Sequence, residues 1–273
     1  MTSKTALVTG ASSGIGEATA RRLHEQGYTV YAAARRVDRM AGLERDGIRI
    51  VRMDVTDDAS MTAVVERILA DTGRVDLLVN NAGYGSYGAV EDVPMDEARY
   101  QFEVNLFGLA RLTQLVTPHM RERGSGRIVN VSSIGGKGSE PLGGWYHAAK
   151  YAVEGLSDAL RMELRPHGID VVVIEPGAIR TEWGQIARDS LLKASGDTAY
   201  AEQAEALARL HASADGIAVE PEVIADAILT ASTARRPRAR YVSPRNARVM
   251  LFVMRFLSDR AKDAVMRTAI RRA

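Results

Sequence analysis

Tyr146 and Lys150 are the residues whose types and spacing first suggest chemistry. They stand four positions apart in the segment YHAAK, and residues at positions i and i+4 lie on one face of a helix. A nearby ammonium stabilises a phenolate, so we expect Lys150 to lower the pKa of Tyr146 from about 10 toward neutral pH. Tyr146 would then serve as a general acid and base. Alone the pattern is weak evidence, because Y-x-x-x-K occurs by chance on many helices.

A serine hydroxyl stands close to this pair in the sequence. Ser133 lies thirteen positions before Tyr146 and is followed by Gly135-Gly136. At the end of a strand its hydroxyl could hold a substrate oxygen. Ser132 is the rival for this role.

A glycine-rich stretch, TGASSGIG at residues 9–16, lies between a short apolar run and an amphipathic segment. Gly10 permits a tight turn, Gly14 permits close approach of a ligand, and Gly16 permits close packing of a helix on a sheet. The unpaired N–H groups of that helix could bind a pyrophosphate. The spacing is G-x3-G-x-G, and a glycine-rich loop alone is weak evidence.

Short apolar runs and helical patterns alternate along the chain and would position these groups. Strands are predicted at 5–9, 28–33, 48–53, 75–80, 126–131, 169–174 and 239–242, and helices at 15–26, 60–71, 96–122, 146–165 and 221–233. This alternation predicts an α/β fold, a doubly wound parallel sheet (Rossmann fold) of about seven strands with helices on both faces. Such sheets bind ligands beyond the carboxyl ends of their strands. Glycines or polar residues follow five of the predicted strands, which favours a site at that edge.

The ordered motifs TGASSGIG, NNAG, Asn105, Ser133, YHAAK and PGAIRT resemble the short-chain dehydrogenase/reductase family in its single-domain branch, over about residues 4–180. The resemblance implies that Tyr146 exchanges a proton with the carbonyl or hydroxyl oxygen and that Ser133 orients this oxygen. Lys150 would hold the nicotinamide ribose and lower the pKa of Tyr146. Asn105 would bind a water that links Lys150 to solvent.

The resemblance also implies a nicotinamide dinucleotide cofactor. The end of the second strand carries Arg35 and Arg36 where an enzyme that prefers NAD usually has an acidic residue. Arginine pairs with phosphate, so we predict a preference for NADP(H), with NAD(H) as the alternative. Arg35 would bind the phosphate of NADP alone if Arg36 faced solvent. The cofactor-binding residues would be Gly10, Ser12, Ser13, Gly14, Ile15, Gly16, Arg35, Arg36, Asp54, Val55, Asn81, Ala82, Gly83, Tyr146, Lys150, Pro176, Gly177, Ile179 and Thr181.

Residues 182–219 fall where the family keeps its variable substrate lid. This stretch is rich in alanine and leucine and predicts a helical lid over an apolar pocket. Trp183, Tyr84, Leu142 and Trp145 are candidate pocket walls, with a purely structural role as the alternative for each. An apolar ketone or alcohol, such as a steroid, a retinoid or a long-chain carbonyl compound, fits better than a sugar.

The composition limits the function classes. There are no cysteines, and the five histidines lack metal-ligand spacing, so we expect no metal site. No signal peptide or long apolar span is evident, so we expect a cytoplasmic protein without a membrane span. We predict one domain over residues 1–243, and the family resemblance suggests a homodimer or homotetramer.

A basic, amphipathic helical extension is predicted over residues 244–273. Residues 235–273 hold twelve Arg or Lys against two Asp, although the whole chain has a net charge of only +2. Apolar residues recur at helical spacing at Val249, Phe252, Val253 and Phe256. Such a helix either makes peripheral contact with an anionic membrane or docks on its own domain or on a partner subunit. Nucleic-acid binding is disfavoured, because stacking aromatics are not interleaved with the arginines.

The family resemblance thus implies an NADP-dependent oxidoreductase that interconverts a carbonyl and a secondary alcohol by hydride transfer, with Tyr146 as the acid and base. Three other functions share some of these signals. An NAD-dependent alcohol dehydrogenase of the same family would differ only in its cofactor. A non-catalytic dinucleotide-binding regulator would be expected to lack the tyrosine or the lysine, and both are present. A sugar epimerase or dehydratase shares Y-x-x-x-K, but its usual glycine spacing and extra substrate domain are missing here.

Overall fold

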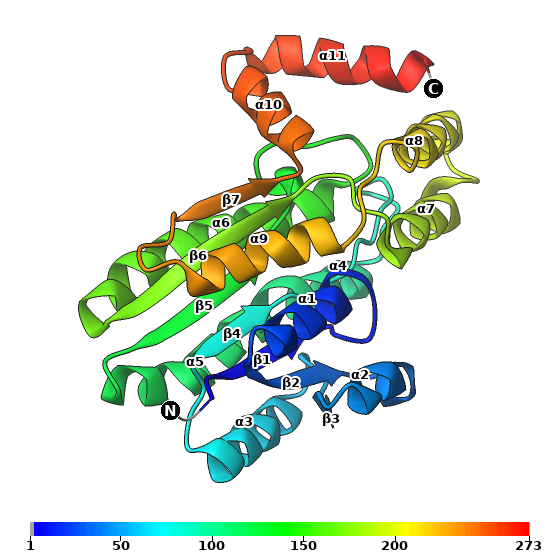
Figure 1. Ribbon diagram of the computed structural model, residues 1–273. Helices are drawn as coiled ribbons and strands as arrows, with labels where there is room; N and C mark the ends of the chain where they lie inside the picture. The colour runs from blue at the N-terminus through cyan, green and yellow to red at the C-terminus, as the bar shows by residue number, and fades with distance from the viewer. Residues whose placement is uncertain (1–2, 273) are drawn as a thin grey trace.

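The computed structural model describes residues 3–272, which contain one parallel sheet with helices on both faces (Figure 1). The seven strands are β1 (Thr5–Thr9), β2 (Thr29–Ala34), β3 (Arg49–Arg52), β4 (Leu77–Asn80), β5 (Gly126–Val131), β6 (Ile169–Pro176) and β7 (Arg240–Ser243). Their order across the sheet is β3-β2-β1-β4-β5-β6-β7, and every neighbouring pair is parallel. The predicted fold class and all seven predicted strands are confirmed. The strand order reverses between β1 and β4, where such sheets form a ligand-binding crevice.

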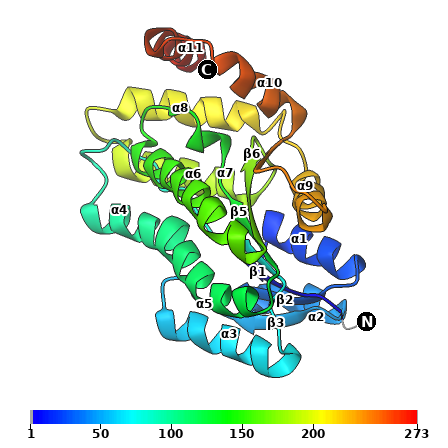
Figure 2. The same cartoon turned by 90° about the vertical axis from the view of Figure 1, so that its left-hand side faces the viewer.

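The sheet is buried on both faces because each strand sends alternate side chains to opposite sides. Ala6 and Val8 of β1 enter one core cluster, whereas Leu7 enters the other. Figure 2 shows α1 and α9 on one side of the sheet and α3, α5 and α6 on the other. The main helices of the two layers are α1 (Gly14–Glu25), α3 (Asp58–Thr72), α4 (Met95–Phe102), α5 (Gly108–Glu122), α6 (Gly144–Leu164) and α9 (Glu222–Thr233).

Several short helices complete the connections. They are η1 (Val37–Met40), α2 (Ala41–Arg45), η3 (Ile134–Gly136) and η4 (Arg165–His167). The single helix predicted over 96–122 is divided into α4, a π-helical turn η2 (Glu103–Phe107) and α5. Such π-turns are frequent at functional sites, and this one carries Asn105.

The lid segment, residues 182–219, forms α7 (Glu182–Ser195) and α8 (Ala201–Ala214). Both helices lie beyond the carboxyl ends of the strands (Figure 1). Ala187 and Leu191 of α7 pack with Ala204 and Leu207 of α8 in a cluster separate from the two cores of the sheet. The lid is therefore a small helical layer of its own.

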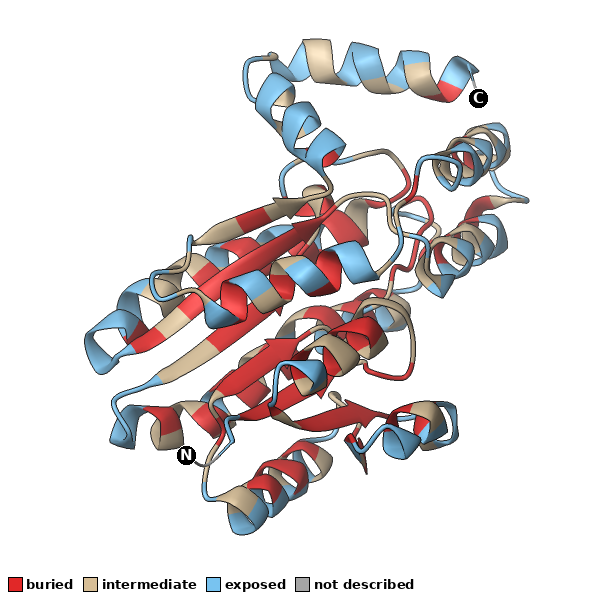
Figure 3. Cartoon of the chain, viewed as in Figure 1, coloured by how far each residue is buried: buried red, intermediate tan, exposed pale blue. Residues whose placement is uncertain are grey.

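The C-terminal extension forms two helices, α10 (Arg245–Met254) and α11 (Asp259–Arg272). Ala247 of α10 is buried against Gly177, and Ile270 of α11 is buried in the cluster formed with the lid. The apolar stripe seen in the sequence is not the face that packs, because Val249, Phe252 and Phe256 are exposed. Figure 3 shows most of the helix α10 in the colour of exposed residues. Among the described residues, no helix has the length and apolar character needed to cross a membrane.

Candidate active site

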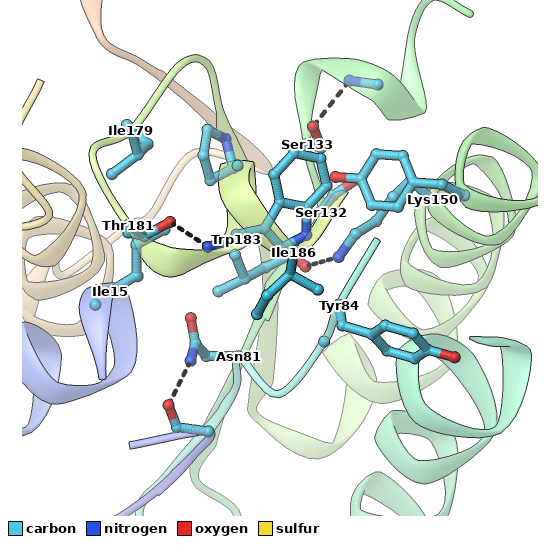
Figure 4. A pocket seen from close by; sticks show the side chains of 18 of the residues that line it. Ile15, Asn81, Tyr84, Ser132, Ser133, Lys150, Ile179, Thr181, Trp183 and Ile186 are labelled. Atoms are coloured by element: carbon cyan, nitrogen blue, oxygen red, sulfur yellow. Dashed lines mark hydrogen bonds between the residues drawn. The ribbon is translucent and has the colours of Figure 1, made fainter. Parts of the chain in front are cut away.

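A cavity of about 820 Å³ opens at the carboxyl ends of the strands. Every predicted cofactor-binding and catalytic residue lines it except Gly16 and Asn105, which lie behind its wall. Figure 4 shows Ser133 and Lys150 on one side of this pocket and Ile15 and Asn81 on the other. Residues that are far apart in the sequence therefore meet at one edge of the sheet.

The glycine-rich loop has the shape that a bound pyrophosphate requires. Gly10 has a φ of +66°, and a Cβ there would lie 2.9 Å from the Ala82 Cα. A Cβ at Gly16 would lie 2.3 Å from the Gly10 carbonyl oxygen, so only glycine allows α1 to lie this close. Ser13 precedes α1 in an extended conformation and makes no capping bond through its side chain. The first N–H groups of α1 are thus available to an anion in the pocket, and a dinucleotide fits the residues present.

The loop after β4 is held by hydrogen bonds to β1. The Asn81 amide nitrogen donates to the Thr9 carbonyl oxygen over 2.9 Å. The Thr9 hydroxyl accepts from the backbone N–H groups of Asn81 and Ala82 over 3.0 and 2.9 Å. These bonds fix Asn81 and Ala82 next to Gly10 on the crevice between β1 and β4.

Tyr146 and Lys150 lie one turn apart on α6 and are both buried. Burial raises the pKa of Tyr146 to about 12, although a hydrogen bond with Ser133 opposes the rise. Burial lowers the pKa of Lys150 to about 8, with the Glu154 carboxylate opposing. The expectation that the pKa of Tyr146 lies below its usual value of about 10 is wrong for this structure, because burial dominates. The Lys150 amine lies 6.0 Å from the Tyr146 ring centroid and donates to the Val131 carbonyl oxygen over 3.0 Å.

Ser133, rather than Ser132, is the serine beside Tyr146. Its hydroxyl accepts from the Gly135 N–H over 3.0 Å and shares the hydrogen bond with Tyr146. The Ser132 hydroxyl is buried and has no hydrogen-bond partner among the described residues. The geometry therefore agrees with the serine chosen from the thirteen-residue interval.

Asn105 lies in the π-turn η2 behind the loop that carries Gly83. Its side-chain oxygen accepts from the Tyr84 N–H over 3.0 Å, and its amide donates to the Tyr84 carbonyl oxygen over 2.8 Å. Asn105 thus braces the loop next to Lys150. Its predicted role with a bound water stays a prediction.

Arg35 and Arg36, predicted as one phosphate site, point to different partners. Arg35 donates to the Tyr100 hydroxyl over 2.7 Å, whereas Arg36 lies 3.5 Å from the Ser12 hydroxyl. Arg39, which the sequence analysis overlooked, joins Arg36 at the same place. Arg39 pairs through two nitrogens with the carboxylate of Glu182, and Arg36 lies 3.7 Å from that carboxylate. Arg36 and Arg39 already hold an anionic group there.

Two of the four candidate pocket walls line the cavity. Tyr84 and Trp183 do so, and the Trp183 ring lies 5.1 Å from that of Tyr146. Trp145, the second residue of α6, instead lines a separate hollow beside α4. Leu142 is buried in the cluster beneath the lid and is absent from the cavity wall.

A polar cluster beside Tyr146 was not predicted. The Glu140 carboxylate accepts from the Tyr87 hydroxyl over 2.9 Å and contacts His211 Nε2 at 3.0 Å. His147 accepts from the Glu140 N–H through Nε2, which leaves Nδ1 to donate to the Gly135 carbonyl oxygen over 2.9 Å. The nearest sequence signal was the polar pair Glu140 and His147 on either side of Tyr146.

Comparison with known proteins places these features in one family. Residues 4–191 match the family model described as short chain dehydrogenase. A 3-ketodihydrosphingosine reductase of Bacteroides thetaiotaomicron is 42% identical over 64% of each chain. An NADPH-dependent 3-dehydrocapnine reductase of Ornithobacterium rhinotracheale is 34% identical over 95% of each chain.

Solved structures give the same result. A short-chain dehydrogenase from Streptomyces avermitilis is 38% identical over 93% of each chain, with a TM-score of 0.81. A metagenomic short-chain oxidoreductase in complex with NADP is 28% identical, with a TM-score of 0.71 over 89% of this chain and 97% of that one. A short chain dehydrogenase/reductase from Burkholderia phymatum in complex with NAD is 26% identical, with a TM-score of 0.80 over 92% of each chain.

Proposed function

The chain belongs to the short-chain dehydrogenase/reductase family, and on that premise we propose that it reduces the ketone of a long apolar substrate to a secondary alcohol with NADPH. The family and its named oxidoreductase relatives favour an enzyme over a regulator that only binds a dinucleotide. One observation carries the proposal. Ser133, Tyr146 and Lys150 meet on the wall of a cavity that is roofed by apolar side chains of the lid and of the C-terminal helices.

The pKa values of Tyr146 and Lys150 support a reduction. With a pKa of about 12, the Tyr146 phenol is protonated at neutral pH and donates its proton to the carbonyl oxygen. Ser133 holds that oxygen through its hydroxyl. Lys150 is an ammonium below its pKa of about 8 and stabilises the phenolate that remains. The nicotinamide, when bound, supplies the hydride.

The preference for NADPH rests on Arg36 and Arg39. Arg36 lies 3.5 Å from the Ser12 hydroxyl, and both arginines contact the Glu182 carboxylate. A site that holds a carboxylate between two guanidinium groups is suited to a ribose phosphate. Solved relatives bind NADP or NAD, so the arginines and not the fold support the choice. Arg35, tied to Tyr100, would contribute less.

The apolar substrate is inferred from the side chains that the lid and the C-terminal helices add to the cavity wall. Ile186 of α7, Leu251 and Met254 of α10 and Met266 of α11 line it. Such side chains favour an aliphatic chain over a sugar. The reductive direction agrees with two relatives, which are named as reductases of a 3-keto and a 3-dehydro compound.

We further propose that α10 and α11 place the enzyme on an anionic membrane surface, as an apolar substrate would require. Val249, Phe252, Val253 and Phe256 form one exposed face at helical spacing, and the Phe252 and Phe256 rings are in contact. Residues 244–273 hold eight Arg or Lys against two Asp. A dimer formed through this face would bring the positive charges of two copies close together, which is unfavourable. Anionic lipid headgroups would instead complement these charges. The opposite face of α10 lines the cavity.

Vesicle flotation tests this contact. The full chain should float with vesicles that contain phosphatidylglycerol and remain behind with pure phosphatidylcholine. Phe252→Glu should abolish flotation, whereas Tyr151→Glu, an exposed aromatic residue on α6, should not. Equal binding to neutral vesicles, or a concentration-dependent dimer that Phe252→Glu disrupts, would contradict the membrane proposal.

Nicotinamide fluorescence during titration with NADPH and, separately, NADH tests the proposed function first. Tight binding of NADPH alone would support the arginine site and would be followed by assays with long-chain ketones. Tight binding of NADH alone would overturn the cofactor preference, and binding of neither by the folded protein would overturn the proposed function. A cytoplasmic location and a homodimer or homotetramer stay predictions.

A further inference from the structure

Glu140 is a carboxylate on the cavity wall with one oxygen left unpaired. Its Oε1 accepts from the Tyr87 hydroxyl and lies 3.0 Å from His211 Nε2. Its Oε2 makes no hydrogen bond to any residue between 3 and 272. The side chain is 18% exposed and faces the same cavity as Tyr146. A carboxylate can accept several hydrogen bonds, so an acceptor remains available inside the pocket.

The carboxylate is ionised despite its burial. Burial raises the pKa of Glu140, but the hydrogen bond and charge interaction with His211 and the hydrogen bond with Tyr87 outweigh it and lower the pKa. His211 contacts only one of the two carboxylate oxygens, so the second oxygen can still accept a hydrogen bond from a charged donor. Among the described residues, no group of His, Asp and Glu side chains is arranged to hold a metal ion. An organic ammonium group, which donates hydrogen bonds and carries a positive charge, would complement the free oxygen.

Aromatic rings stand around the same place. The Tyr87 ring lies 5.6 Å from the Tyr146 ring and 6.0 Å from the Trp183 ring, measured between centroids. Aromatic faces attract ammonium groups, most strongly where water is excluded. A carboxylate beside several aromatic rings is thus a suitable environment for an alkylammonium group.

The position next to Tyr146 gives the cation a role in the reaction. The Glu140 charge raises the pKa of Tyr146 and so disfavours the phenolate that forms when Tyr146 gives up its proton. A cation bound to Glu140 would offset this charge. The carboxylate would then hinder a neutral substrate and help a cationic one.

We propose that Glu140, with Tyr87 and His211, forms a subsite for an ammonium group that the substrate carries close to its ketone. The substrate would be an amino ketone with a long apolar chain. This inference rests on the proposed function, because it places the ammonium relative to a carbonyl held by Ser133 and Tyr146. Glu140 would be a specificity-determining residue for that reaction.

Two matched ketones test the subsite. One is a long-chain ketone with an amine on the carbon next to the carbonyl, and the other is the same ketone without the amine. The wild-type enzyme with NADPH should favour the amino ketone in kcat/KM. Glu140→Gln, which keeps an oxygen for the Tyr87 and His211 donors, should reduce that preference roughly 10-fold or more. Glu205→Gln, an exposed carboxylate on α8, should leave the preference unchanged.

A binding measurement separates recognition from turnover. A long-chain alkylamine should compete with the ketone more strongly than the corresponding alcohol, and Glu140→Gln should remove the difference. Equal kcat/KM for the two ketones in the wild type, or equal losses on both in Glu140→Gln, would overturn the subsite and leave ketone reduction standing. Reduction of neither ketone would instead refute the proposed function.

Discussion

The ion pair between Glu182 and two arginines predicts a specific effect on cofactor affinity. Glu182 is the first residue of α7, and its carboxylate pairs with Arg39 and lies 3.7 Å from Arg36. A ribose phosphate at these arginines has to displace that carboxylate, whereas NADH carries no such phosphate. Glu182→Gln should therefore tighten the binding of NADPH and leave the binding of NADH unchanged.

The size of the effect follows from the exposure of the pair. The Arg36, Arg39 and Glu182 side chains are 52%, 36% and 47% exposed, and exposed ion pairs contribute about 0.2–1 kcal/mol. Removing the carboxylate should thus tighten NADPH binding by roughly 1.5- to 5-fold. Arg36→Ala should weaken it by roughly 10- to 150-fold, because hydrogen bonds to charged groups contribute about 1.5–3 kcal/mol.

Fluorescence titration of each variant with NADPH and with NADH measures the dissociation constants of the two cofactors, and NADH serves as the internal control. The ratio of the two dissociation constants should move in opposite directions in Glu182→Gln and Arg36→Ala. Weaker NADPH binding in Glu182→Gln would show that the carboxylate supports the cofactor and does not compete with it. Equal changes for both cofactors would refute the phosphate site.

Three further predictions concern the catalytic residues and the sheet. Tyr146→Phe should lower ketone reduction by roughly 100- to 10,000-fold, while NADPH titration still shows binding; substantial turnover in this variant would disprove the acid role. The pH profile of kcat/KM for reduction should fall as pH rises above about 8, where Lys150 loses its charge, and Lys150→Arg should lack that limb if the assignment is right. Asp76→Asn should destabilise the fold by about 1–3 kcal/mol, because Asp76 accepts from Arg74 and from the Thr5 N–H. Those donors lower the pKa of Asp76 in the folded state, although burial opposes this. The difference in unfolding free energy between the wild type and Asp76→Asn should therefore be full above about pH 4 and shrink as pH falls through the lowered pKa. A difference that does not change with pH would contradict this prediction.

The sheet could be predicted from the sequence because parallel strands buried on both faces are continuous apolar runs. The ends of those runs placed Gly10, Asn81, Ser133 and Pro176 at one edge without any knowledge of contacts. The pKa of Tyr146 could not be predicted in the same way. Spacing puts Lys150 on the same helix face, but the burial that dominates the pKa depends on Trp183 and on the lid, which pack on Tyr146 from elsewhere in the chain.

The polar cluster around Glu140 depends on contacts over longer distances in sequence. Glu140 lies 53 positions from Tyr87 and 71 from His211, so no local pattern connects them. The C-terminal stripe was ambiguous for another reason. Both faces of α10 are apolar, with Phe252 on one and Leu251 on the other, so periodicity does not reveal which face packs on the protein.

The packing of α11 on α8 makes the end of the chain part of the pocket. Met266 lines the cavity, and Ile270 is buried with the lid three residues before the last residue of the sequence. An affinity tag fused to the C-terminus would therefore hang directly beside the roof of the active site. β1 begins at Thr5, at the amino ends of the strands and away from the pocket (Figure 1), so a tag joined ahead of it should not disturb the active site.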